Sequence, residues 1–432
     1  MGSYFKVLTV CFVALLIVIL GILVVDKLLG DEINRFWDND KEITLLDDSG
    51  FSEEGVNKIV EGNNKFAFDL FLQYVNDDSI AEGNIFFSPI SIHSALSMTY
   101  EGANGDTANE ISKALYLNID TDLRLPNYAR IFNEINNNHQ NYSLNIANAL
   151  WMQDDYPVKT SYKDVITNFY GGEARNLDFL NETDASAEII NKWIEEKTQK
   201  KIKDMFSEGS INSDIRLVLT NAIYFKGDWE IQFDKENTVK TSFSTLDGGK
   251  TEVDMMSLKE ESFNYYQNDD LQMVEMSYKG DDVSMIVILP RDGKFESVQK
   301  MLTFEKYNEW KSSMTSEQVN IYFPKFKFET MTLLKPYLQD MGIVSAFEPG
   351  VADFSGIDGT RSLFIDLVIH KAFVEVNEEG TEAAGATGVT VGVTSMPQAY
   401  TFRADRPFIF FIQNKKNGNI FFMGRMSDIS DK

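Results

Sequence analysis

The segment EEGTEAAGATGVTVGVTS, from Glu378 to Ser395, is the most informative part of this 432-residue sequence. It is rich in Gly, Ala and Thr, contains no proline and has no residue larger than valine after Glu382. An ordinary surface loop or a glycine-weakened hairpin is one interpretation of this composition. The alternation of side chains favours another, because every second residue is small at first and apolar later: Thr381, Ala383, Gly385, Thr387, Val389 and Val391. Such a set suits a strand that inserts into a packed sheet.

Sequence patterns elsewhere predict both strands and helices. Runs of β-branched and aromatic residues occupy 282–290, 318–329, 370–379 and 407–426. In the last run, Asn417-Gly418 indicates a hairpin turn between two strands. The first half of the chain predicts helices, since Asn64 to Val75 has apolar residues at helical spacing and Ser88-Pro89 is typical of a helix start. We therefore expect an α+β fold.

Composition excludes several classes of function. The chain is 43% hydrophobic and 12% aromatic, which excludes a disordered protein. It has 40 Lys and Arg against 66 Asp and Glu, and the resulting net charge of -26 repels nucleic-acid phosphates. One cysteine and three histidines leave no disulfide framework and no cluster for zinc or iron. We expect no nucleic-acid partner, no metal and no cofactor.

The amino-terminal region predicts a membrane segment. The uncharged run from Val7 to Val25 is long enough for a spanning helix, and Lys6 before it places the start in the cytoplasm. A cleavable signal peptide is the alternative, although its apolar part is usually about 7–15 residues and ends in a small-residue site that is not found here. We predict an anchor or signal segment (1–30), an acidic tether (31–55) and one globular domain (56–432). The domain is then expected on the extracellular face of the membrane, or secreted if the segment is cleaved.

Motifs of hydrolases are absent. Neither GxSxG nor HExxH occurs, and the histidines lie in unrelated contexts. The run Asp247 to Thr251 superficially resembles a phosphate loop, but Ser244 stands where the first glycine would be, so a β-turn is the better interpretation. No spacing singles out a pair among the carboxylates. We predict no catalytic residues.

Five segments, in chain order, resemble the serpins, a family of serine-protease inhibitors that trap their target by inserting a reactive loop into a sheet. They include NIFFSPISIHSALSMTYEGANGDTANEI, LTNAIYFKGDWEIQFD and HKAFVEVNEEGTEAAGAT, and the full set spans Asn84 to Ile111, Leu219 to Asp234, Phe243 to Met256, His370 to Thr387 and Phe402 to Met426. The resemblance implies the serpin fold, with helices of the first half packed on large, mostly antiparallel sheets. It also implies an exposed reactive loop at 380–402.

The resemblance further implies how the loop works. A protease attacks it as a substrate, and the freed segment enters the sheet while the protease is still joined through an acyl bond. The hinge of this movement maps to Gly380, Thr381, Glu382, Ala383, Ala384, Gly385 and Ala386. Non-inhibitory serpins tend to carry proline or bulky residues there, so the hinge favours the inhibitory type. A non-inhibitory serpin that acts as a binding or structural module is the alternative.

The resemblance also assigns a sheet-opening cluster of five residues. Ser88, Ser91, Asn221 and His370 match a hydrogen-bonded group beneath the strands that open, and Trp229 matches a tryptophan near the point where the loop enters. For His370 alone, a structural histidine is the default interpretation. Ser88 is equally suited to be a helix N-cap.

Two positions compete for the bond that the protease attacks. Counting forward from Gly380 by the inhibitory pattern gives Thr394-Ser395, whereas counting back from Phe402 gives Val393-Thr394. We favour the first. A small, uncharged residue gains no ion pair in a trypsin-like pocket, so elastase-like or subtilisin-like serine proteases are the expected partners, with a cysteine protease as a further option. We expect the protein itself to be a monomer.

Overall fold

The computed structural model describes residues 45–80, 82–136, 141–381 and 399–430. A compact unit extends from Leu46 to Lys432. It starts before the predicted boundary at residue 56, because part of the predicted tether packs on the body. The Leu46 N–H donates to Asn133 Oδ1 at 2.8 Å, and Ser52 caps a helix that begins at Glu53.

Several predicted features lie outside the described residues. They are the anchor from Val7 to Val25, most of the tether, hinge residues 382–386 and the three candidates for the reactive bond, Val393, Thr394 and Ser395. In the ranges that are described, no helix is long and apolar enough to cross a membrane.

The larger of two sheets has nine strands. In the order β1-β15-β14-β8-β7-β6-β9-β13, with β5 paired to β6, these are β1 (Ile85–Phe87), β15 (Ile420–Met426), β14 (Phe408–Asn414), β8 (Val283–Pro290), β7 (Leu271–Ser277), β6 (Lys250–Gln267), β9 (Thr315–Pro324), β13 (Tyr400–Arg403) and β5 (Val239–Ser244). All neighbours are antiparallel except β9 and β13. The predicted hairpin is confirmed, since β14 pairs with β15 across a turn in which Gly418 has a φ of 74°.

The second sheet has six strands and carries the candidate site. Its order is β10 (Phe326–Leu333), β11 (Leu367–Val376), β12 (Gly380–Thr381), β4 (Leu217–Asp228), β2 (Tyr142–Gln153) and β3 (Glu173–Leu177). Only β2–β3 and β4–β11 are parallel. The predicted α+β fold with mostly antiparallel sheets is thus confirmed.

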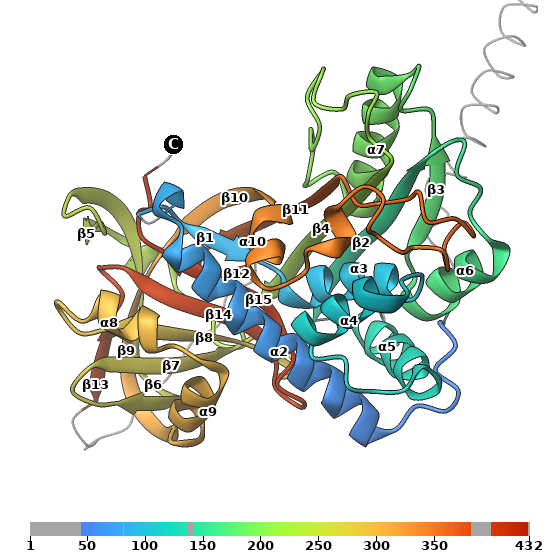
Figure 1. The fold of residues 1–432 in the computed structure, drawn as a ribbon. Coiled ribbons are helices and arrows are strands. Elements are labelled where there is room, and N and C mark those ends of the chain that lie inside the picture. The colour runs from blue at the N-terminus through green and yellow to red at the C-terminus, as the bar shows by residue number, and fades with distance from the viewer. Residues whose placement is uncertain (1–44, 81, 137–140, 382–398, 431–432) are drawn as a thin grey trace, which may run out of the picture. The chain divides into compact units, whose positions relative to one another are not determined.

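The helices of the first half of the chain precede every strand of the larger sheet except β1, and the described residues form nine helices in all. They are α2 (Glu53–Asn76), α3 (Pro89–Tyr100), α4 (Gly105–Ala114), α5 (Thr121–Asn136), α6 (Thr160–Val165), α7 (Thr183–Lys197), α8 (Phe295–Met301), α9 (Phe304–Ser312) and α10 (Lys335–Asp340), with short 3-10 or π turns at η1 (Asp78–Ile80), η2 (Ile166–Tyr170), η3 (Lys235–Asn237) and η4 (Ser345–Phe347). Figure 1 shows α2 beside α3 and α5, and α7 near β2 and β3. The predicted helix start at Ser88-Pro89 is confirmed, because α3 begins at Pro89 with Ser88 as its N-cap.

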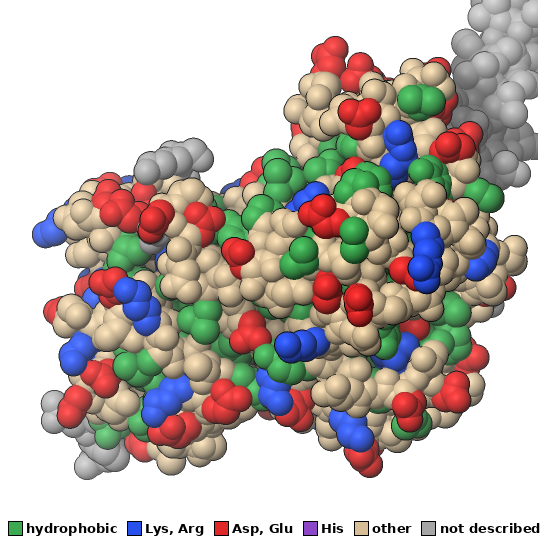
Figure 2. Space-filling view, in the orientation of Figure 1, with side chains coloured by type: hydrophobic (Ala, Val, Ile, Leu, Met, Phe, Trp, Pro, Cys, Tyr) green, Lys and Arg blue, Asp and Glu red, His purple; other side chains and the backbone are tan. Residues whose placement is uncertain are grey.

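Strand β4 of the second sheet is buried on both faces, which explains its nearly continuous apolar sequence. Leu219 and Ile223 belong to the core that includes α3, whereas Val218 and Ala222 belong to a second core beneath α7. Alternate residues of a strand point to opposite faces, so both sets must be apolar. The exposed surface is different: Figure 2 shows acidic and basic side chains interspersed over the visible face.

Close packing in the main core depends on a glycine in β15. Phe86 of β1 stacks on Phe422 with ring centroids 5.1 Å apart and on Phe410 at 5.7 Å. A Cβ atom at Gly424 would lie 2.5 Å from the Phe410 ring and 3.0 Å from the Ile85 carbonyl oxygen. Because a buried ring and a sheet backbone cannot both move aside, a side chain is not tolerated there.

We predict that Gly424→Ala lowers the stability of the fold by about 1–3 kcal/mol through overpacking. Gly83→Ala is the matched control, because a Cβ atom there meets its nearest neighbour at an ordinary 3.6 Å. Urea unfolding followed by circular dichroism measures both. Equal unfolding midpoints for the two variants would contradict the packing argument.

Candidate functional site

The candidate site lies where β4 and β11 separate. The two strands are parallel neighbours over 218–223 and 367–372. Farther along, no strand pairing joins 224–226 to 373–375 within the part of the chain that the structure describes. The facing edges of these two segments therefore carry backbone groups with which a further strand could pair.

The short strand β12 lies at the far end of this separation. Thr381 pairs with Val376 of β11 and with Gly227 of β4, and Gly380 pairs with Asp228. Both pairings are antiparallel, so at this end of the sheet β12 lies between β4 and β11, which are parallel to each other. The first two residues of the predicted hinge thus already lie between the strands.

Gly380 has no room for a side chain. A Cβ atom there would lie 2.1 Å from the Gly227 carbonyl oxygen and 2.6 Å from the Asp228 Cα. These are backbone atoms of β4 and cannot turn away as a side chain would. Glycine is required because the hinge passes directly against the neighbouring strand.

Thr381 is held in a closed environment. Its side chain is 1% exposed, and its hydroxyl shares a hydrogen bond of 2.7 Å with the Tyr278 hydroxyl. The Tyr278 ring stacks on Trp229 at 4.6 Å, and Trp229 Nε1 donates to the Asn377 carbonyl oxygen at 3.0 Å. Burial raises the pKa of Tyr278 far above its usual value, so the phenol stays neutral. Only a small side chain fits at position 381 in this arrangement.

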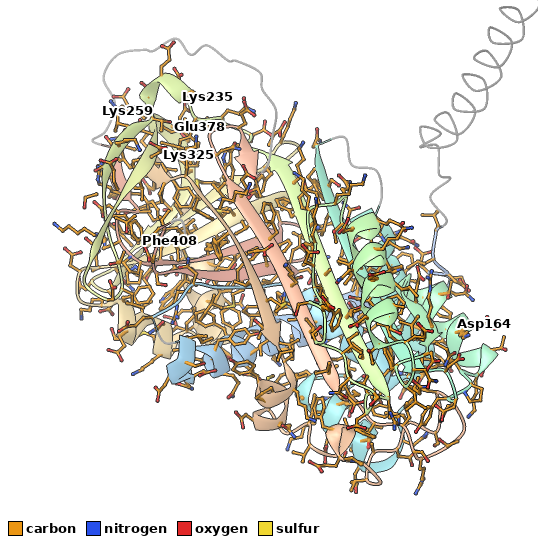
Figure 3. All side chains as sticks on the ribbon, turned by 90° about the horizontal axis from the view of Figure 1, so that it is seen from above. Asp164, Lys235, Lys259, Lys325, Glu378 and Phe408 are labelled. Atoms are coloured by element: carbon orange, nitrogen blue, oxygen red, sulfur yellow. The ribbon has the colours of Figure 1, made fainter. Side chains whose placement is uncertain are left out.

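Two ion pairs flank the tight turn that precedes β12. Glu378 contacts Lys325 at 3.0 Å and accepts a hydrogen bond from the Thr238 hydroxyl at 2.8 Å, and Glu379 contacts Lys235 at 2.6 Å. Figure 3 shows Lys235, Lys325 and Glu378 close together at one end of the sheet. Burial alone would raise the pKa of Glu378, but hydrogen bonds from its own backbone, Lys325 and Thr238 outweigh burial and lower it. The Glu378 carboxylate therefore stays charged, and the two ion pairs hold the turn in place.

His370 lies where β4 and β11 are still joined. It faces Asn221 in the strand register and is fully buried. Its Nε2 accepts from the Ser88 N–H at 3.1 Å, so Nδ1 must carry the proton that is donated to Asn221 Oδ1. Burial lowers the pKa of His370 to about 3. The ring is therefore neutral, and protonation would place a second proton against the Ser88 N–H.

The other members of the cluster complete one hydrogen-bonded group. Asn221 Nδ2 donates to Ser91 Oγ and to Asn148 Oδ1. Asn148 Nδ2 in turn donates to Ser94 Oγ at 2.8 Å. The Ser88 hydroxyl caps α3 by accepting from the Ser91 N–H at 3.3 Å, so the helix-cap interpretation also holds. The group ties α3, β2, β4 and β11 together beneath the joined strands.

The structure thus divides the five predicted cluster residues between two places. Four lie together at the joined part of the strands, whereas Trp229 follows the end of β4 beside β12. The sequence analysis missed Tyr278, Lys325 and Lys235. The sequence could have pointed to Lys325, because it is a lysine within the apolar strand run 318–329. No sequence pattern indicates the role of Tyr278, because its partner is 103 positions away in the chain.

We predict that His370→Gln reduces the acid sensitivity of the fold. Neutral His370 contributes its full stability above pH 6.5, and this contribution falls by about 1.4 kcal/mol per pH unit as the pH drops from 6.5 toward 3. Glutamine keeps an acceptor for Ser88 but has no ring to protonate. Thermal unfolding between about pH 7 and pH 5 should show a shallower pH dependence for the variant, and equal slopes would rule out the assigned protonation state.

Comparisons with known proteins agree with this geometry. A family model described as "Serpin (serine protease inhibitor)" matches residues 61–429. Human Serpin B4 is 41% identical over 394 residues, covering 86% of this chain and 100% of its own. The horse leukocyte elastase inhibitor is 37% identical over 373 residues, with coverage of 84% and 98%.

Solved structures give the same result for the fold. The crystal structure of Serpin48 from the insect Tenebrio molitor superposes with a TM-score of 0.77 at 30% identity, covering 86% of this chain and 98% of that one. Together with the family model and the relatives, this match establishes that this chain belongs to the serpin family.

Proposed function

We propose that this serpin is an extracytoplasmic inhibitor of serine endopeptidases that acts as a suicide substrate. Cleavage of its reactive loop would let the segment after Gly380 enter the second sheet between β4 and β11 and trap the acyl-protease. The observation that carries the proposal is the position of Thr381, which already pairs with both strands.

The strand register supports insertion over a longer distance. Val376 of β11 and Gly227 of β4 both pair with Thr381, and His370 of β11 pairs with Asn221 of β4. In each case the β11 residue number exceeds the β4 residue number by 149, so the two strands keep the same relative register at both places. A strand that continues from Thr381 therefore meets β4 and β11 without a shift in either. It would place Thr387 between His370 and Asn221, so deep insertion must break their hydrogen bond.

The side-chain pattern fits the same register. Residues of one face alternate along a strand, so the inserted positions on the face of Thr381 are Ala383, Gly385, Thr387, Val389 and Val391. Thr381 points toward Tyr278 in the main core. The small residues would thus enter first against the packed side, with the valines following.

Energetic magnitudes indicate what must drive insertion. About 12 inserted residues gain hydrogen bonds of roughly 0.5–1.5 kcal/mol each, whereas ordering their backbone costs roughly 1–2 kcal/mol per residue. These terms nearly cancel. The drive must come from burial of Val389 and Val391 and, for the larger part, from relief of a metastable sheet that is held open between β4 and β11.

Elastase-like or subtilisin-like enzymes are the proposed targets. The candidate residues at the reactive bond, Val393, Thr394 and Ser395, are small and uncharged. The name of the horse relative, leukocyte elastase inhibitor, is in keeping with this choice.

We also propose that residues 7–25 anchor the protein in a membrane or direct its secretion.

Incubation with an elastase and with a subtilisin tests the proposal. A protein band at the summed mass that survives denaturation is expected, together with a higher melting temperature of the loop-cleaved protein. Clean cleavage at the loop without a stable complex or added thermal stability would instead indicate a non-inhibitory serpin that acts as a binding or structural module.

We predict that Thr381→Arg converts the inhibitor into a substrate. Position 381 is already buried beside Tyr278 and Trp229, so an arginine would be displaced from between the strands. Its guanidinium would have to be buried there again during insertion, which raises the barrier so that water releases the acyl-protease first. The number of inhibitor molecules consumed for each protease inactivated, measured by titration of protease activity, should rise at least about tenfold.

Thr381→Ser is the matched control, because it keeps the hydroxyl that bonds to Tyr278. It should retain nearly the original stoichiometry. Covalent trapping by Thr381→Arg with unchanged stoichiometry would refute the role of this residue in the hinge.

A further inference from the structure

A cavity is lined on one side by Trp229. It encloses about 220 Å³ between β6, β7, the start of β9 and the chain that follows β4. Its apolar lining residues are Trp229, Ile231, Phe233, Leu258, Phe263 and Met276. This volume is several times that of one water molecule, which occupies roughly 30 Å³ in the liquid.

The charged residues that line this cavity all carry the same sign. They are Glu230, Glu275 and Asp281, and no Lys, Arg or His contributes to the lining. Asp281 is paired with Lys415, whose Nζ also contacts Ser277 Oγ at 3.0 Å. The Glu230 carboxylate accepts from the Gly280 N–H at 3.0 Å. Within the described residues neither Glu230 nor Glu275 forms an ion pair, and both lie beside the apolar lining. The combination attracts a cation that has an apolar part.

Glu275 is the more informative of the two, because it is only 9% exposed. Its Oε1 accepts from Ser284 Oγ and its Oε2 from Asn264 Nδ2, both at 2.7 Å. In the described residues its hydrogen-bond partners are thus neutral. The charge of Glu275 also interacts with that of Lys311. A carboxylate can accept about four hydrogen bonds, so Glu275, with two donors, keeps accepting capacity toward the cavity that it lines.

We propose that this cavity binds a small organic amine with an aromatic or alkyl body. The ammonium group would lie beside Glu275 and Glu230, and the body would pack on Trp229, Phe233 and Phe263. The net charge of -26 adds a favourable long-range attraction for such a cation. An anionic ligand of the same shape would meet repulsion from both carboxylates.

Two residues that line the cavity, Trp229 and Phe233, are hydrogen-bonded to the segment 377–379 before β12, which we call the loop junction. The Trp229 N–H donates to the Glu379 carbonyl oxygen at 2.8 Å, and the Phe233 N–H donates to the Glu378 carbonyl oxygen at 2.9 Å. A ligand that contacts both side chains holds this segment in the arrangement that positions β12. It therefore favours the state in which these hydrogen bonds are made, provided that it binds that state more tightly. This connection extends the proposed function, whereas amine binding itself does not depend on it.

Ligand-observed NMR titration of the full chain with phenethylamine tests binding. We expect saturable binding with a dissociation constant below about 1 mM. The neutral 2-phenylethanol and the anionic 3-phenylpropionate should bind at least about tenfold more weakly, because neither gains from the carboxylates. Equal affinity for the alcohol and the amine, or no saturation by about 10 mM amine, would overturn the proposal.

Substitutions of Glu275 and Glu230 test which carboxylate binds the ammonium group. Glu275→Gln should weaken amine binding about tenfold or more, and Glu230→Gln, at an exposed position, should weaken it to a smaller degree without endangering the fold. Asp269→Asn is the matched control, since it removes one exposed charge at the β6–β7 turn outside the cavity lining. Unchanged affinity in both glutamine variants, or equal loss in Asp269→Asn, would contradict the site.

Hydrogen exchange locates the ligand and tests the connection to the loop junction. Saturating phenethylamine should slow exchange at 229–233 and at 377–379, and leave the β14–β15 hairpin unchanged. Slower exchange at 229–233 alone would support the site and contradict the connection. Neither result requires protease inhibition, so failure of the proposed inhibitor function would be recognised separately.

Discussion

Incomplete pairing between β4 and β11 is the constraint on which the rest of this structure depends. The strands are joined over 218–223 and 367–372, and then separate toward β12. Their facing edges are parallel, and an added strand would be antiparallel to both without a change of register. Antiparallel ladders have straighter hydrogen bonds than parallel ones, so the sheet gains from the exchange. The structure therefore leaves edges on β4 and β11 with which an added antiparallel strand could pair favourably.

Two groups of side chains border this separation, and they differ in chemistry. At the joined end, neutral His370 and Asn221 hold the strands together with Ser88 and Ser91 of α3 in a fully buried hydrogen-bonded group. At the other end, an apolar stack and two ion pairs fix the turn before β12. In the proposed mechanism, insertion would break the first group but could leave the second intact. The joined end would then set the barrier to insertion, and the other end would set where the inserted strand starts.

Local sequence signals predicted much of the fold. The hairpin at Asn417-Gly418 and the helix start at Ser88 were correct because each is specified by a few adjacent residues. The contact of Leu46 with the body could not be predicted locally, because its partner Asn133 lies 87 positions away.

For the candidate site, too, residues with a local sequence pattern could be predicted, whereas contacts between distant strands could not. Thr381 was singled out by the alternation of small residues and Gly380 by the family resemblance, whereas Tyr278 and the ion pair of Glu378 with Lys325 required the folded arrangement of distant strands. The family resemblance supplied the grouping of Ser88, Ser91, Asn221 and His370. No spacing rule would have joined them, because α3, β4 and β11 meet only in three dimensions.

The most direct measurement is hydrogen exchange of the intact protein and of the protein cleaved at the reactive loop. The account predicts that backbone amides in 224–226 and 373–375 exchange much more slowly after cleavage, because a new strand then pairs with both edges. Amides in β14 and β15, which are paired throughout, should not change. Unaltered exchange at 224–226 and 373–375 after cleavage would show that no strand enters between β4 and β11, and would contradict the account.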